Sequence, residues 1–70
     1  MKIHWKCNEE KIGWRVAAEL PLPGGVKIQT DVIIPRWRMS PTAMLQTIVD
    51  SNRAINEARM RHELQTRRIA

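Results

Sequence analysis

Three stretches of alternating apolar and polar residues fill the first half of this 70-residue chain, and turn-forming residues follow the first two. Alternation with a period of two places the apolar side chains on one face of a β-strand and the polar side chains on the other. Polar residues 8–11 separate the first two stretches, and the Pro- and Gly-rich segment 21–25 separates the last two. The pattern therefore predicts three amphipathic strands, at residues 1–8, 12–20 and 26–34.

The first pair of strands has a predicted register. A hairpin closed at residues 8–11 would place Cys7 opposite Ile12 and Trp5 opposite Trp14. Each of these pairs joins two apolar faces, and a slip of one residue would turn one of those faces to water. We expect Trp5 and Trp14 to form a cross-strand pair in the core.

The second pair of strands also has a predicted register. A hairpin closed at residues 21–25 would bring Glu19 beside Lys27 and Arg15 beside Asp31 on the polar face. Opposite charges on neighbouring strands stabilise a ladder, so this register agrees with the hydrophobic pattern. Together the two hairpins predict a three-stranded antiparallel meander.

The second half of the chain is predicted to form one long helix. Pro35 ends the third strand because it cannot donate a hydrogen bond to the ladder. Ser40 is suited to the N-cap and Pro41 to the first helical position. Residues 41–66 contain no further proline or glycine. The fold class is therefore α+β, with a βββα order, in a single domain of residues 1–70.

The predicted helix is longer than the sheet. It would run about 39 Å, against about 30 Å for the strands, so its last turns should extend past the sheet. An apolar stripe at helical spacing is expected to lie on the sheet: Met44, Leu45, Ile48, Asn52 and Ile55. Met60, Leu64 and Ile69 lie beyond that stripe and predict a homodimer through the C-terminal helix.

Composition excludes several classes of protein. Hydrophobic residues at 43% and charged residues at 27% are typical of a globular chain, not of a disordered one. The longest strictly apolar runs, such as residues 32–34, are only about three residues long, so we expect no membrane span and no signal peptide. A single cysteine, Cys7, cannot form an internal disulfide. A cytoplasmic protein is the expectation.

The sequence contains few residues that could bind a metal ion or take part in catalysis. His4 and Cys7, three apart on a strand, point to opposite faces and cannot hold one ion, and His62 is isolated on the helix. Cys7 is expected to face the core, and Ser40 is explained by capping. His4 opposite Arg15 could serve metal-free RNA cleavage, but a solvated histidine is the better interpretation. We expect no enzyme, no catalytic residue, no metal and no cofactor.

The excess of basic residues in the second half of the chain indicates a binding function. The net charge is +5, and residues 36–70 hold seven arginines, no lysine and three acidic residues. Arginine presents a planar fork suited to phosphates and guanine edges. The first hypothesis is a non-enzymatic regulator that binds DNA or RNA. The predicted binding residues, for a nucleic acid or for a protein partner, are Arg36, Trp37, Arg38, Arg59, Arg61, Arg67 and Arg68. A secondary surface on the open sheet face comprises Lys2, Lys6, Arg15 and Lys27.

The element order resembles that of the small DNA-binding domains of some recombinases and plant transcription factors, which set a three-stranded sheet in the major groove. The chain carries none of the sequence motifs of those families. The resemblance implies only that the sheet face could meet a nucleic acid.

The second hypothesis is a compact inhibitor or adaptor of the kind encoded by phages and mobile elements. Its basic surface would bind an acidic patch on a host protein, with Trp37 and the C-terminal helix as the contact surface. Trp37 has two interpretations. It covers one end of the core beside the helix start, or it is an exposed anchor for the partner.

Overall fold

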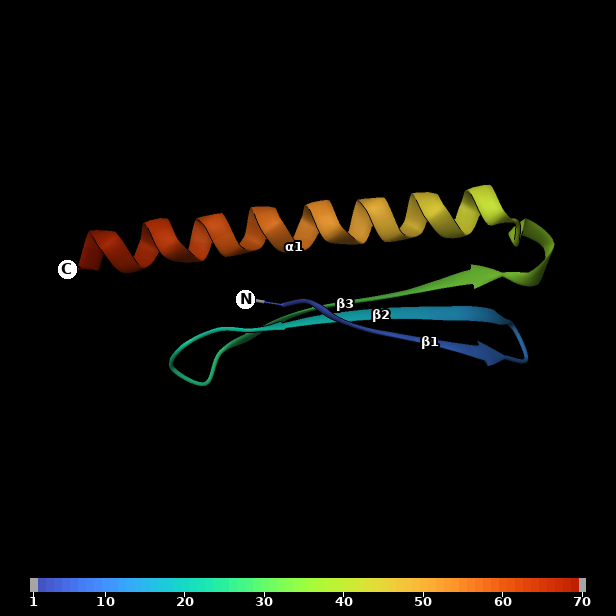
Figure 1. The fold of residues 1–70 in the computed structure, drawn as a ribbon, viewed down its shortest axis with the longest axis horizontal. Helices are drawn as coiled ribbons and strands as arrows, with labels where there is room; N and C mark the ends of the chain where they lie inside the picture. The colour runs from blue at the N-terminus through green and yellow to red at the C-terminus, as the bar shows by residue number, and fades with distance from the viewer. Residues whose placement is uncertain (1, 70) are drawn as a thin grey trace.

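A three-stranded antiparallel sheet and one long helix make up the computed structural model, which describes the backbone of residues 2–69 and the side chains of residues 2–67 (Figure 1). The predicted α+β class and the element order are confirmed. The elements are β1 (His4–Glu10), β2 (Gly13–Pro21), β3 (Lys27–Pro35), the 3-10 turn η1 (Arg36–Arg38) and α1 (Pro41–Ile69).

The β1–β2 hairpin is tighter than predicted. Its turn consists of Lys11 and Ile12 alone, so Trp5 lies opposite Ala18 and Cys7 opposite Val16. The expected pairing of Trp5 with Trp14 is therefore wrong, by a shift of four residues. The shift is an even number, so each side chain keeps its predicted face of the sheet. Sequence pattern alone could not separate the two registers, because both join apolar face to apolar face.

The β2–β3 hairpin is shifted from its predicted register by two residues. Leu20 lies opposite Ile28, and the pairing continues to the end of β2 because the loop begins only at Leu22, whose side chain is buried. The backbone N–H of Leu22 donates to the carbonyl oxygen of Val26 over 2.7 Å and closes the loop. The even shift again preserves the faces of the sheet.

Both predicted ion pairs of this hairpin form, although along diagonals of the ladder. The Lys27 amino group lies 3.2 Å from the Glu19 carboxylate, and the Arg15 guanidinium lies 2.7 Å from Asp31. Arg15 itself stands opposite Ile33. Long side chains reach a diagonal neighbour as readily as a direct one, so these charges favour the meander without selecting one register.

The start of α1 follows the predicted capping. The backbone N–H of Ala43 donates to the Ser40 hydroxyl over 3.0 Å, which satisfies one of the free N–H groups of the first turn. The helix reaches Ile69, three residues beyond its expected end. Figure 1 shows α1 lying along the whole sheet and continuing past the β2–β3 loop, as expected from its length, within a molecule of 48 × 19 × 17 Å.

The core lies under the middle of α1. Ile55 is fully buried and belongs to one cluster with Ala18, Leu20 and Leu22. The helix packs mainly against β3 and β2, at one side of the sheet. The helix-facing side of β1 is therefore largely uncovered.

Two predictions about β1 are wrong for that reason. Cys7 is exposed instead of facing a closed core, and Trp5 is 39% exposed. Both residues lie on the predicted face of the sheet, but the helix does not cover that part of it. Trp14, on the central strand, is half-buried.

Candidate interaction surfaces

The turn after β3 is held in place by an arginine that the sequence suggested as a ligand contact. The Arg36 guanidinium donates to the carbonyl oxygens of Lys11 over 2.8 Å and Glu10 over 3.1 Å, and its backbone N–H donates to the Ile12 carbonyl. Because its hydrogen bonds tie η1 to the β1–β2 turn, Arg36 has a positioning role in the fold. Its side chain is still largely exposed, 3.8 Å from the carboxylate of Glu9.

Trp37 stands out from the surface at this end of the molecule. It is 83% exposed, so the interpretation in which it covers the core is wrong. The Arg38 guanidinium lies over its ring, 5.9 Å from the ring centroid, in a cation–π contact. The Met39 backbone N–H donates to the Arg36 carbonyl oxygen and closes the turn that carries both side chains.

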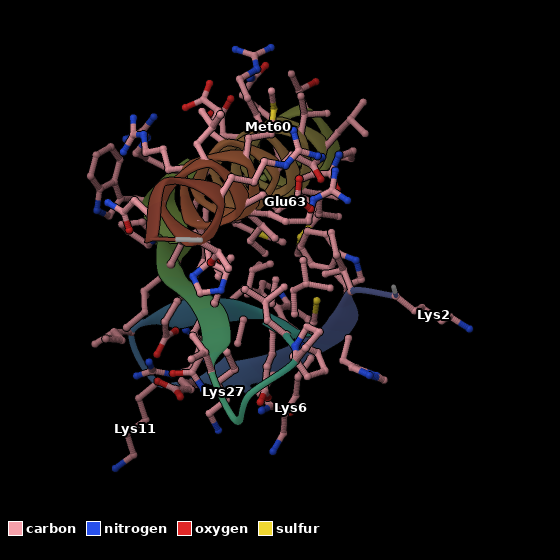
Figure 2. All side chains as sticks on the ribbon, turned by 90° about the vertical axis from the view of Figure 1, so that its left-hand side faces the viewer. Lys2, Lys6, Lys11, Lys27, Met60 and Glu63 are labelled. Atoms are coloured by element: carbon pink, nitrogen blue, oxygen red, sulfur yellow. The ribbon has the colours of Figure 1, made fainter. Side chains whose placement is uncertain are left out.

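The open face of the sheet is electrically balanced. Facing away from α1, three basic side chains alternate with three carboxylates: Lys6, Arg15 and Lys27 with Glu10, Glu19 and Asp31. Figure 2 shows Lys6, Lys11 and Lys27 on this side of the molecule, whereas Lys2 points away at the N-terminal end of β1. A shallow hollow of about 410 Å³ lies over Ala17 on this face. This arrangement lacks the excess of positive charge that a phosphate-binding face needs.

Arg15 sits at the centre of that balance. It reaches the Glu10 carboxylate over 2.6 Å and the Asp31 carboxylate over 2.7 Å. The hydrogen bond from Arg15 is the main cause that lowers the pKa of Glu10 below its usual range, against a smaller opposing effect of desolvation. Hydrogen bonds to Glu10 and then Asp31 raise the pKa of Arg15 further above its already high value.

The link between Arg15 and Glu10 predicts an acid-dependent loss of stability. Because the pKa of Glu10 is lower in the folded state, its contribution is present above the pKa of an unfolded glutamate and is lost as pH falls through the folded value. In Arg15→Met we expect the Glu10 pKa to rise to the usual glutamate range, measured by NMR titration of its carboxyl carbon. Lys27→Met, which breaks the neighbouring pair, should leave the Glu10 pKa unchanged. An unchanged Glu10 pKa in Arg15→Met would contradict the assignment.

The arginines of α1 whose side chains the structure describes do not all lie on one flank of the helix. Arg59 is half-buried, and its buried Nε has no hydrogen-bond partner among the described residues. Arg61 is exposed and, two residues along the helix, lies on the opposite flank. Arg67 is exposed beside a hollow of about 310 Å³ between the end of α1 and the β2–β3 loop. The side chain of Arg68 lies outside the described residues.

The predicted contacts are therefore spread along the length of the molecule. Arg36, Trp37 and Arg38 precede the start of α1, whereas Arg67 lies near its far end (Figure 1). A helix of 26 residues between the two groups separates them by about 39 Å. The structure does not bring the candidate residues into a single site.

The sequence pattern placed part of the apolar stripe of α1 on the wrong side of the helix. Leu45 and Asn52 were expected to lie on the sheet, but both are exposed, and so is Val49. The sheet-facing side of the helix instead contains Ser51 and Ile55, which are buried. A helical projection centred on Ser51 would have placed Leu45 and Val49 on the far side, but the small polar serine gave no hydrophobic signal.

Among the side chains of residues 2–67, no three His, Cys, Asp or Glu residues gather as a metal-binding group. Nor does any helix in the described part of the chain have the length and apolar character needed to cross a membrane.

Comparison with protein-family models, with curated proteins and with solved structures finds no match to this chain.

Proposed function

We propose that this chain is a non-enzymatic protein-binding module whose anchor is Trp37. The observation that carries the proposal is an 83% exposed tryptophan on a turn that is fixed by hydrogen bonds. An exposed indole in water is costly unless a partner covers it, and tryptophan is among the residues most enriched at interface hot spots. Because Arg36 holds the turn, little conformational entropy is lost when the indole enters a pocket.

The partner is an acidic protein surface with an apolar pocket. Arg38 lies over the Trp37 ring and forms no ion pair among the described residues, so its charge is available to a partner carboxylate. The net charge of +5 would speed the approach of such a partner. This corresponds to an adaptor or an inhibitor that occupies an acidic patch.

The geometry favours a protein over a nucleic acid as the partner. The open sheet face is balanced in charge, and Arg15 and Lys27 are paired with carboxylates there. The described arginines of α1 lie on different flanks, whereas a phosphate backbone needs a continuous basic stripe. The nucleic-acid hypothesis, carried by Arg61 and Arg67, is kept as the competing outcome of the test.

The test compares two variants in an affinity capture from host lysate treated with nuclease. We expect Trp37→Ala to weaken binding of the captured protein by about 2 kcal/mol, or roughly thirtyfold in Kd, because the anchor is lost while the fold survives. Ile12→Ala is the matched control, since Ile12 is an exposed apolar residue of the neighbouring turn. Calorimetry with the purified partner would measure the affinities.

A different result would contradict the proposal. If nucleic acid co-purifies without nuclease, leaves at high salt and depends on Arg61 and Arg67 but not on Trp37, the chain is a nucleic-acid binder. Glutamate substitutions at the two arginines would then lower the affinity, and the slope of affinity against salt would become shallower.

A further inference from the structure

The solvent-facing side of α1 is a second apolar face. Leu45, Val49, Met60 and Leu64 are each between 42% and 63% exposed. At about 100° per residue they fall within an arc of roughly 100°, on the side of the helix opposite Ser51 and Ile55. Figure 2 shows Met60 pointing away from the sheet, on the far side of α1 from Lys6 and Lys27.

The four residues are placed symmetrically along the helix. Leu45 and Leu64 are equally distant from the midpoint between residues 54 and 55, and so are Val49 and Met60. A surface that pairs with a copy of itself about a twofold axis must have this property, because residue i contacts j and j contacts i. A different partner protein would not require it.

We propose that this face joins two copies of the chain through an antiparallel pair of α1 helices. Leu45 packs against Leu64 of the second copy, and Val49 packs against Met60 of the second copy. The apolar contacts extend from Leu45 to Leu64, about 29 Å of helix, which adds burial that a small domain cannot obtain from its own core.

The charges at the centre of the face agree with the antiparallel direction. Arg53 and Glu57 are both exposed and lie one turn apart at the middle of the helix. In the antiparallel register Arg53 comes within one residue of Glu57 of the second copy, and the symmetry produces this pair twice. A parallel pair would instead bring Arg53 against Arg53, which is unfavourable.

The pairing has a consequence for the turn that carries Trp37. Because the helices run in opposite directions, the two η1 turns lie at opposite ends of the dimer, roughly 40 Å apart along the helices. Such a dimer presents two copies of that turn on opposite ends of one particle. Its existence does not depend on what Trp37 binds, so it can be tested separately from the proposed function.

The experiment uses charge substitutions at the contact between Val49 and Met60. Light scattering and sedimentation across the micromolar range should show a dimer for the wild type. Val49→Lys and Met60→Glu should each weaken the dimer at least about tenfold, because each places an unpaired charge in an apolar contact. With both substitutions in one chain, the dimer should recover, since each lysine then faces a glutamate of the second copy.

The controls keep the result interpretable. Both side chains are exposed in a single copy, so far-UV circular dichroism should show the wild-type fold for every variant. Ile12→Lys changes another exposed apolar residue, away from the helix, and should leave the dimer intact. A wild-type monomer at every concentration, a dimer insensitive to both single changes, or a double variant weaker than either single one would overturn the proposal.

Discussion

Replacing Gly13 with alanine is expected to remove a large fraction of the free energy of unfolding. Gly13 begins β2 with a φ of 157°, and a Cβ atom there would collide with the backbone carbonyl of Ile34. The collision cannot be relieved by a side-chain rotation, because the obstructing atoms belong to the backbone of β3. The strands would have to separate at the position where Gly13 pairs with both Glu10 and Pro35.

The expected size of this effect is large for so short a chain. We expect Gly13→Ala to cost at least about 3 kcal/mol, from steric overlap together with an unfavourable backbone conformation. A domain of this length has a free energy of unfolding of roughly 4 to 10 kcal/mol. Urea unfolding followed by tryptophan fluorescence measures the loss, because all three tryptophans lie in or near the sheet.

A second glycine provides the matched control. Gly24, in the β2–β3 loop, also has a positive φ, of 88°, but open space surrounds the position of its absent Cβ. Gly24→Ala should therefore cost only the conformational strain, about 1 kcal/mol. Equal losses for the two variants would show that the close approach of β2 and β3 at Gly13 is not required.

Replacing Ile55 with alanine is expected to remove about 2 to 5 kcal/mol of stability. Its side chain is fully buried between α1 and the sheet, in the cluster with Ala18, Leu20 and Leu22. Removing three carbon atoms there leaves a cavity, and the closely packed side chains of the sheet cannot shift enough to fill it. The midpoint of urea unfolding should fall while the slope of the transition stays unchanged.

Ile12→Ala removes the same atoms from an exposed position. Ile12 is 62% exposed in the β1–β2 turn, so the substitution should change stability by no more than about 0.5 kcal/mol. The difference between the two isoleucine variants isolates the contribution of burial under α1. If both variants lost the same stability, α1 would not be packed on the sheet as described.

The candidate surfaces were only partly predictable. The sequence pointed to Trp37 and Arg38, and the structure places them together in one exposed turn. The sequence also suggested Arg36 as a contact, but the Arg36 guanidinium donates hydrogen bonds to backbone carbonyl groups 25 and 26 residues earlier in the chain. A local sequence pattern cannot predict a hydrogen bond between residues so far apart in the chain.

Local patterns were enough to predict the elements and their faces. Strand faces follow from a period of two, and the start of α1 follows from Ser40 and Pro41, because these depend on backbone geometry over a few residues. The registers were not predictable, because shifts of two or four residues preserve every face and so leave the apolar pattern equally satisfied.

The position of α1 over the sheet was also beyond local pattern. A helix with apolar residues on two sides can lie on any pair of strands, and only the packing of Ile55 with Leu20 and Leu22 places it over β2 and β3. That choice leaves Trp5 and Cys7 uncovered and turns Leu45 and Val49 to solvent. Burial is a property of contacts between distant segments, so the exposed surfaces of this protein arise from its tertiary packing, whereas its strands and helix arise from short-range periodicity.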